Sequence, residues 1–301
     1  MIEVYAVIVT YNPNLEILEK GLMALSCQVS MIIVVDNHSA NATEIIDLCQ
    51  SIDNCQSINL QDNEGIGFAQ NKGIKKALDL NASHVILFDQ DSIVDKGFVC
   101  NLLQAEKTAI AEGVNVGITG PVYKSPNDNF LYPIYTFNGN KYIQLKIDNS
   151  KEYIEVSHVI ASGELIRREV FDLVGYMRED LFISQVDYEF CFRSSFYGFS
   201  IIRASNASMT HNMGDKQISI LGRKIGIYSP FRRYFTCRNG VLLLKDKYYP
   251  KKAAWISIKL SFLRTIVGIL YGPNRTKQLK YSCRGFWDGI KGVSGKCPLT
   301  H

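Results

Sequence analysis

The stretch VILFDQD, residues 85–91, decides the fold, because four apolar residues run directly into two carboxylates. An apolar run of this kind predicts a buried strand that ends at Asp89. Asp89 and Asp91 then repel each other, with no basic residue beside them in the sequence. A divalent cation bridging to phosphate oxygens would relieve that repulsion, since Mg²⁺ is typically held by one or two carboxylates plus substrate phosphates. A solvated turn is the alternative, because Asp is common in turns.

The surrounding residues alternate short β-branched runs with segments of helical periodicity. This alternation predicts βαβ units that build a mainly parallel sheet. The expected strands are 4–10, 31–36, 57–60, 85–89 and 114–119. The expected helices are 15–25, 43–51, 67–80 and 96–112. Open α/β sheets bind ligands at the carboxyl ends of their strands, so polar motifs at those ends indicate one site.

Polar residues follow the first two expected strands. Thr10, Tyr11 and Asn12 follow the first, and Asp36 and Asn37 follow the second. Hydroxyl, amide and carboxylate groups at adjacent strand ends can hydrogen-bond a nucleobase and its ribose. The same residues are also ordinary turn and cap signals, so each motif is weak by itself.

Residues 63–73 read NEGIGFAQNKG, a glycine-rich turn that leads into a helix. Gly65 lets backbone approach a ligand, and Asn71, one or two turns into the helix, is expected to point into the crevice. Gln70 stands where the dinucleotide-binding fingerprint requires its third glycine or an alanine. The turn therefore argues against hydride chemistry.

The composition is that of a globular protein. With 301 residues, 47% of them hydrophobic, the chain can bury a large core. Its eight cysteines include no Cys-x-x-Cys pair, which argues against a zinc cluster and a disulfide framework and favours the reducing cytosol. The first residues lack the basic region and cleavage site of a signal peptide.

The charge is distributed unevenly. Residues 216–301 contain 18 Lys and Arg against two acidic residues, whereas the whole chain has a net charge of +4. Residues 253–271 are strongly apolar but contain Lys259 and Arg264, and a spanning helix would place both cations near the bilayer centre. We expect this segment to lie in the interface of an anionic membrane. A core helix is the alternative, and nucleic acid is not expected because no binding motif is present.

Taken together, these motifs resemble glycosyltransferase family 2, most closely its rhamnosyltransferase branch. The set carrying the resemblance is VTYNP (9–13), VDN-x-S (35–39), the glycine turn at 63–73, DQDS (89–92), GP (120–121), ASG (161–163), VDYE (186–189), HNMG (211–214) and RN (238–239). The resemblance covers roughly residues 3 to 240. It implies the α/β GT-A fold, a Rossmann-like mixed sheet, here followed by a helical, basic C-terminal extension.

The resemblance also implies roles for individual residues. Asp187 would be the catalytic base that takes the proton of the acceptor hydroxyl. The donor-binding residues would be Thr10, Tyr11, Asn12, Asp36, Asn37, Asn63, Gly65, Asn71, Asp89, Gln90, Asp91 and Arg238. Asp91 would be the main ligand of Mg²⁺ or Mn²⁺, with Asp89 and His211 completing the protein's share. Ser162, Gly163 and Glu189 would face the acceptor, although Glu189 also suits a structural role.

We therefore expect an inverting, metal-dependent glycosyltransferase on the cytoplasmic face of the inner membrane. It would move L-rhamnose from dTDP-L-rhamnose to a lipid-linked oligosaccharide during O-antigen or capsule synthesis. Residues 1–122 would bind the nucleotide sugar, 123–227 the acceptor and 228–301 the membrane.

Three alternatives remain at this point: a UDP-sugar donor, a phosphohydrolase with Asp89 as nucleophile and Asp91 as acid/base, and a non-catalytic nucleotide-sugar or lipid-binding module. A phosphohydrolase would normally place the Asp-x-Asp strand first, whereas three βα units precede it here.

Overall fold

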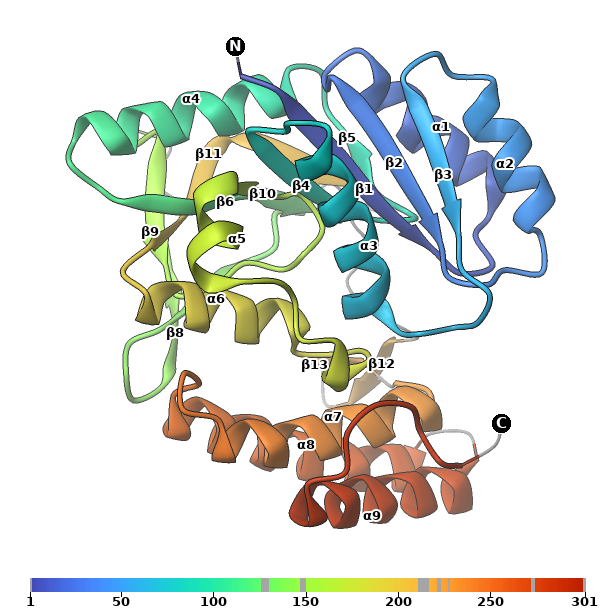
Figure 1. Ribbon diagram of the computed structural model, residues 1–301. Coiled ribbons are helices and arrows are strands. Elements are labelled where there is room, and N and C mark those ends of the chain that lie inside the picture. The colour runs from blue at the N-terminus through green and yellow to red at the C-terminus, as the bar shows by residue number, and fades with distance from the viewer. Residues whose placement is uncertain are drawn as a thin grey trace.

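The computed structural model describes residues 2–125, 130–146, 150–210, 217–220, 223–226, 228–271 and 274–299. These residues fold around a central mixed β-sheet with helices on both faces, and three further helices form a separate layer at the C-terminal end of the chain (Figure 1). The structure thus has the architecture expected from the sequence, a mixed α/β sheet followed by a helical extension.

The first half of the chain is a series of parallel βα units. Its elements are β1 (Val4–Thr10), α1 (Leu15–Ser26), β2 (Met31–Asp36), α2 (Ala42–Gln50), β3 (Cys55–Asn59), α3 (Ile66–Asp79) and β4 (His84–Asp89). Strand β1 lies between β2 and β4, so that Val9 pairs with Val35 on one side and with Asp89 on the other. The carboxyl ends of these strands therefore meet at one edge of the sheet, as the sequence predicts.

The second half adds antiparallel strands. Its elements are β5 (Ile93–Val94), α4 (Phe98–Ala111), β6 (Val116–Lys124), β7 (Ile134–Phe137), β8 (Tyr142–Leu145), β9 (Tyr153–Val156), β10 (Glu164–Arg167), α5 (Arg168–Val174), the 3₁₀ turn η1 (Glu179–Leu181), α6 (Val186–Phe196) and β11 (Ser200–Thr210). The order across the sheet is β3-β2-β1-β4-β10-β6-β11-β5, with β9 beside β11. Two hairpins lie outside it, β7–β8 and β12 (Gln217–Ile220)–β13 (Arg223–Gly226).

Several boundaries differ from those expected. The strand expected at 114–119 runs over Val116–Lys124, and the one expected at 57–60 runs over Cys55–Asn59. Strand β11 escapes the sequence pattern because its second half contains Ser and Asn and shifts register against β6 between Arg203 and Ser208. Its strand conformation comes from pairing with neighbouring strands, which outweighs local propensity.

Two hydrophobic cores hold the helices to the sheet. Side chains of α1, α2 and α4 pack on one face around Ile8 and Ile86, and side chains of α3, α5 and α6 pack on the other around Val7 and Val85. The alternating side chains of β1 and β4 thus serve both cores, which is why these strands appear in the sequence as continuous apolar runs.

The C-terminal layer consists of α7 (Pro230–Lys245), α8 (Lys251–Tyr271) and α9 (Arg275–Lys291). Pro230 occupies the start of α7, where its missing N–H costs nothing, and the Ser229 hydroxyl accepts from the Arg232 N–H at 3.3 Å. Within the described residues α8 alone has the length and hydropathy of a membrane span, a weak indication in itself, and only 28% of its most apolar window is buried. Its small residues Ala253, Ala254, Ser261 and Thr265 are buried, so α8 packs against the protein along one side and is exposed along the other.

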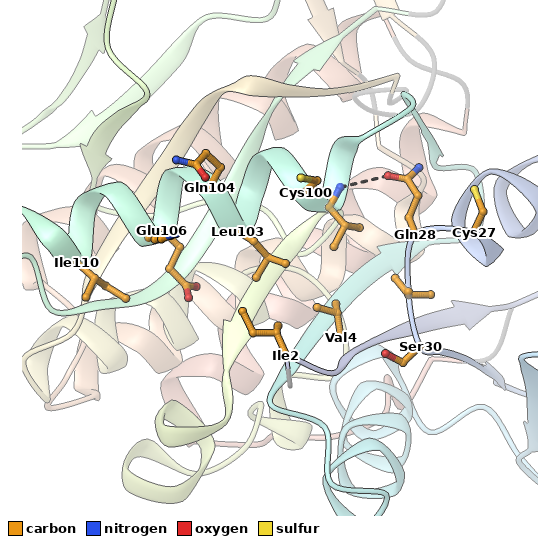
Figure 2. A pocket seen from close by; sticks show the side chains of 13 residues that line it. Ile2, Val4, Cys27, Gln28, Ser30, Cys100, Leu103, Gln104, Glu106 and Ile110 are labelled. Carbon is orange, nitrogen blue, oxygen red and sulfur yellow. Dashed lines mark hydrogen bonds between the residues drawn. The ribbon is translucent and has the colours of Figure 1, made fainter.

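A cavity of about 700 Å³ opens at the opposite edge of the sheet (Figure 2). It lies between the beginning of β1, the connection from α1 to β2, and α4, and its lining includes Val4, Gln28, Val99 and Glu106. The Val99 N–H donates to the Gln28 side-chain oxygen at 3.3 Å across its rim. Because Val4 begins β1, this cavity lies away from the strand ends that carry the polar motifs.

Candidate active site

A hydrogen-bond network joins the ends of β1 and β2. The Thr10 hydroxyl donates to Asp36 Oδ1 at 2.9 Å, and the Ser39 N–H donates to Asp36 Oδ2 at 2.8 Å. Thr10 and Asp36 are fully buried, whereas Tyr11 is 48% exposed. The Ser39 hydroxyl also donates to Asp36 Oδ1, so the carboxylate fixes the shape of this corner.

The glycine turn is tied to the same edge. Asn37 Nδ2 donates to Asn63 Oδ1 at 3.0 Å, and Asn37 Oδ1 accepts from the Glu64 N–H at 2.9 Å. Gly65 has φ +89, and a Cβ there would lie 2.6 Å from the backbone oxygen of Phe182. Glycine is therefore required twice at this position, for its left-handed backbone and for its close contact with the loop before α6.

The Asp89-Gln90-Asp91 turn connects β4 to β5 beside this network. Gln90 Oε1 accepts from the Tyr11 N–H at 2.7 Å, so this turn and the β1 end are locked together. Asp89 is half-buried and Asp91 is exposed. Both lie at the strand edge where the sequence predicts a diphosphate.

The donor set at this turn fits a hard divalent cation in an open site. No group of three or more His, Cys, Asp or Glu side chains converges in the parts of the chain that the structure describes. Two carboxylates would then hold the ion together with donor phosphates and water, as is usual for Mg²⁺. His211, the third expected ligand, lies outside the described residues.

Asp187 occupies the first turn of α6 and is half-buried. Burial, and to a smaller extent the negative charge of Asp89, raises the pKa of Asp187 to about 6, although backbone N–H groups of Tyr188 and Ala161 oppose the increase. The helix N-terminus favours the ionised form as well. A carboxyl with this pKa is suited to accept a proton near neutral pH.

A second carboxyl that the sequence interpretation overlooked lies close to Asp187. Glu164 begins β10 and is fully buried, and Cys191 Sγ donates to its Oε1 at 3.5 Å. Burial raises the pKa of Glu164 well above its usual range, and the charge of Asp187 raises it as well, whereas the Cys191 contact lowers it. Its signal in the sequence is a single acid directly before the apolar pair Leu165-Ile166.

The structure corrects the role expected for Asn71. Its side chain is 2% exposed, and its amide donates to the Met177 carbonyl at 2.9 Å and to Glu179 Oε1 at 2.8 Å. Asn71 Oδ1 accepts from the Met177 N–H at 2.9 Å. The amide therefore anchors the segment before η1 instead of facing a donor.

All three of the expected acceptor residues also make contacts within the protein. Glu189 is 1% exposed and pairs with Arg193 at 2.8 Å, which is the structural role the sequence left open. The fully buried Ser162 hydroxyl shares a hydrogen bond of 2.5 Å with Ser92. The Gly163 N–H donates to the Leu87 carbonyl at 2.7 Å and so extends the pairing of β10 with β4.

Arg238, expected among the donor-binding residues, is fully buried in α7. Its guanidinium donates to the backbone oxygens of Asp180, Leu181 and Gly295. This geometry contradicts a donor-binding role. The neighbouring Asn239, part of the same sequence motif but given no role in the sequence analysis, binds the same loop through its amide.

Comparison with known proteins decides the family. The family model described as glycosyl transferase family 2 matches residues 5–175. The chain belongs to glycosyltransferase family 2. As a family 2 protein it resembles the dTDP-rhamnosyl transferase RfbF of Shigella flexneri, with 35% identity over 293 residues, 97% of each chain. It also resembles the low-salt glycan biosynthesis hexosyltransferase Agl10 of Haloferax volcanii, with 25% identity over 78% of this chain and 75% of that protein.

Solved structures confirm the GT-A fold expected for a family 2 transferase. GalNAc-T7 with UDP, GalNAc and Mn²⁺ superposes with a TM-score of 0.62 at 15% identity, over 97% of this chain and 56% of the other. TarS 1-349 of S. aureus in complex with UDP-GlcNAc gives 0.57 at 16% identity, over 97% and 82%.

If Asp187 is the base, as the sequence predicts, its pKa sets the pH dependence of this glycosyltransferase. A base must be ionised to accept a proton, so kcat/KM is expected to rise about tenfold per pH unit below about 6 and to level off above it. Initial rates between pH 5 and 8 measure this limb. A flat profile down to pH 5 would contradict the assignment of Asp187 as the base.

Proposed function

We propose that this family 2 glycosyltransferase transfers L-rhamnose from dTDP-L-rhamnose, with inversion, to a lipid-linked oligosaccharide in O-antigen or capsule synthesis. The donor is inferred from the 35% identity, over nearly the full length of both chains, to a protein named as a dTDP-rhamnosyl transferase. The observation that carries the chemistry is the half-buried Asp187, whose pKa is raised to about 6 beside the Asp89 strand end.

In this mechanism Asp187 removes the proton of the acceptor hydroxyl as that oxygen attacks the anomeric carbon. The bond from that carbon to the diphosphate oxygen breaks on the opposite face, so the configuration inverts without a covalent intermediate. A Mg²⁺ or Mn²⁺ ion held by Asp91 and Asp89 would stabilise the charge that develops on the departing diphosphate. The part of the site that would hold the nucleotide is shaped by residues at the strand ends and in the glycine turn: Thr10, Tyr11, Asn12, Asp36, Asn37, Asn63, Gly65 and Gln90.

A transfer assay tests this proposal. Purified protein is incubated with Mn²⁺, radiolabelled dTDP-L-rhamnose and the lipid-linked saccharide fraction of the source organism. Label is expected to move into the organic phase only when the lipid fraction is present. Higher rates with UDP-glucose or UDP-N-acetylglucosamine would overturn the rhamnose assignment alone, whereas phosphate release from a phosphomonoester without acceptor would favour the phosphohydrolase.

The C-terminal layer supports a peripheral position on the cytoplasmic face of the inner membrane. Large apolar side chains of α8 are exposed, at intervals that place most of them on one face: Trp255, Phe262, Leu263, Ile266 and Leu270. Lys259 lies on the same face, where its apolar stem can immerse while its ammonium reaches anionic headgroups. We accordingly keep residues 1–122, 123–227 and 228–301 as the proposed donor, acceptor and membrane parts.

Replacing Phe262 and Leu263 by serine is expected to weaken binding to anionic liposomes roughly tenfold or more, because each side chain is 56% exposed and would lose its partition into lipid. Cosedimentation with phosphatidylglycerol vesicles measures this. Binding by the unaltered protein should also decrease at high salt. The matched control is Leu173→Ser on α5, a residue 57% exposed outside the C-terminal layer. Equal binding by all variants would contradict docking through α8.

A further inference from the structure

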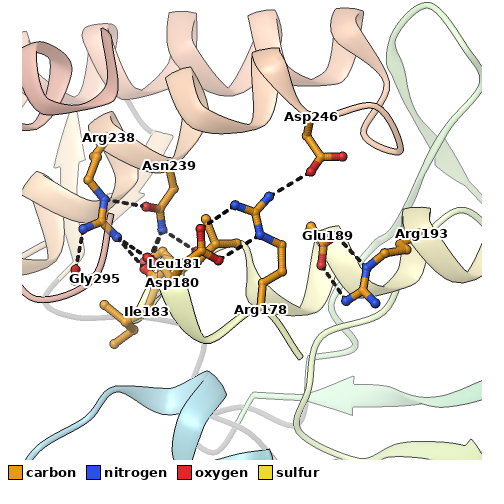
Figure 3. Close-up of polar contacts among 11 residues, drawn as sticks. Arg178, Asp180, Leu181, Ile183, Glu189, Arg193, Arg238, Asn239, Asp246 and Gly295 are labelled. Atoms are coloured by element: carbon orange, nitrogen blue, oxygen red, sulfur yellow. Dashed lines mark hydrogen bonds and ion pairs between the residues drawn. The ribbon is translucent and has the colours of Figure 1, made fainter. Parts of the chain in front are cut away.

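Helix α7 holds the loop that leads into α6, the helix that carries Asp187 (Figure 3). The loop comprises residues 180–185 and ends two residues before Asp187. Two adjacent side chains of α7, Arg238 and Asn239, reach its backbone, and both are fully buried. Both side chains bind backbone oxygens of the loop and no charged side chain in it. Their contacts therefore depend on the backbone conformation of the loop.

Arg238 binds backbone oxygens of two segments. Its Nη2 donates to the Leu181 oxygen at 2.8 Å and to the Asp180 oxygen at 3.2 Å, and its Nη1 donates to the Gly295 oxygen. Its Nε donates to Asn239 Oδ1 at 3.0 Å. The planar fork of a guanidinium suits several fixed acceptors at once, which a lysine ammonium does not reproduce.

Asn239 continues the same contact along the loop. Its Nδ2 donates to the backbone oxygens of Leu181 at 3.0 Å, Ile183 at 2.8 Å and Ser184 at 2.9 Å. Because Arg238 occupies its Oδ1, the amide is fixed in orientation with its hydrogens towards the loop. The two side chains thus act as one unit, here called the α7 clamp.

The loop requires such support because its backbone is strained. Phe182, Ser184 and Gln185 have φ values of 64, 70 and 66, in the left-handed region that residues other than glycine rarely adopt. Strain of this kind persists only where the surrounding structure imposes it, and it is concentrated at functional sites. Gln185 directly precedes α6 without a side-chain cap, so the loop sets the direction in which α6 presents Asp187.

The loop also contacts the donor side. The Ile66 N–H donates to the Phe182 oxygen at 2.7 Å, and Gly65 packs against that residue. Arg178 secures the start of the loop by pairing with Asp180 at 2.6 Å and with Asp246, just beyond α7, at 2.8 Å. The clamp therefore acts where the proposed base and the glycine turn meet.

We propose that Arg238 and Asn239 are positioning residues for the transfer reaction, because they hold the strained 180–185 loop in the conformation that places Asp187 against the acceptor hydroxyl. This inference rests on the proposed role of Asp187 as base.

The test compares Asn239→Ala and Arg238→Lys with the unaltered enzyme in the transfer assay. Asn239→Ala is expected to lower kcat by about 10- to 100-fold, since a misplacement of about 1 Å can cost 10²-fold. Arg238→Lys should give a smaller loss, because it keeps the cation but not the fork. The KM for dTDP-L-rhamnose should rise by a smaller factor than kcat falls, because Arg238 and Asn239 reach the glycine turn only through the backbone of Phe182.

Glu106→Gln is the control, since it weakens the buried contact of Glu106 with His84 at 3.1 Å far from the loop. It should lower the melting temperature without lowering kcat. Two outcomes would overturn the positioning role. In the first, both clamp variants fold and keep kcat within twofold of the unaltered enzyme. In the second, kcat falls and the donor KM rises by the same factor. If Asn239→Ala does not fold, Arg238→Lys alone decides by the same criteria. Full activity of Asp187→Asn would instead overturn the proposed base itself.

Discussion

Asp187→Asn is expected to lower kcat for sugar transfer by about 10²- to 10⁴-fold, the range that a positioned general base contributes. Asparagine keeps the size of the side chain but cannot accept the proton of the acceptor hydroxyl. Donor affinity should remain nearly unchanged, because the proposed role of Asp187 is towards the acceptor hydroxyl and not towards the nucleotide. Steady-state kinetics with varied donor and fixed acceptor measure both effects.

The control for this substitution is Glu169→Gln, which removes a carboxylate in the same half of the chain. Glu169 contacts Arg167 at 3.0 Å on the surface, where ion pairs contribute little, so its loss should leave kcat within about twofold. Full activity of Asp187→Asn would show that another group removes the proton. An equal loss in both variants would show that the effect is not specific to the base.

Asp91→Asn is expected to reduce kcat/KM by about 10²-fold or more, because a metal ion on a departing diphosphate supplies several kcal/mol of charge stabilisation. Asp91 is exposed at the turn after β4, so its replacement should not disturb the core. The activity of the unaltered enzyme should disappear with EDTA and return with Mn²⁺. Transfer assays over a range of Mn²⁺ concentrations distinguish weaker metal binding from loss of catalysis.

Asp95→Asn supplies the comparison for this prediction. Asp95 follows β5 and binds Lys124 at 2.7 Å and Ser208 at 2.6 Å, and the Lys124 and Ser208 contacts hold the pKa of its carboxyl below the usual range despite partial burial. Its loss should leave the Mn²⁺ dependence unchanged. The opposite outcome is that Asp91→Asn keeps an EDTA-sensitive activity that needs the same Mn²⁺ concentration as the unaltered enzyme. That result would contradict the role of Asp91 as a metal ligand.

The nucleotide side of the fold could be predicted because its signals are local. Strands β1 and β2 begin and end at the expected residues, since both are buried on two faces and appear as unbroken apolar runs. Parallel pairing then brings Thr10 beside Asp36, and Asp89 beside Val9, without further information.

Contacts between distant segments could not be predicted in the same way. Asn71 binds Met177, 106 residues away, and Arg238 binds Leu181, 57 residues away. In the sequence each is a polar residue in a helix beside a motif, which fits a ligand contact and a structural contact equally. Only packing decides between them, because a buried amide or guanidinium must satisfy its donors with whatever backbone the fold supplies.

The role of Asp187 could be predicted only in part from the sequence. Its place at the start of a helix is visible in the sequence, whereas its raised pKa depends on burial and on the charge of Asp89, which is 98 positions earlier in the chain. The resemblance to glycosyltransferase family 2 supplied the assignment, and the structure supplies a physical reason for it.

Thermal unfolding with nucleotide sugars, with and without Mn²⁺, tests the central claim most directly. Ligand at a hundredfold excess over its dissociation constant stabilises by about 2.7 kcal/mol, which should raise the melting temperature by roughly 5 °C. We predict this rise for dTDP-L-rhamnose only with Mn²⁺ or Mg²⁺ present, and its loss in Asp91→Asn. The absence of a metal-dependent rise with any nucleoside diphosphate sugar would contradict the account.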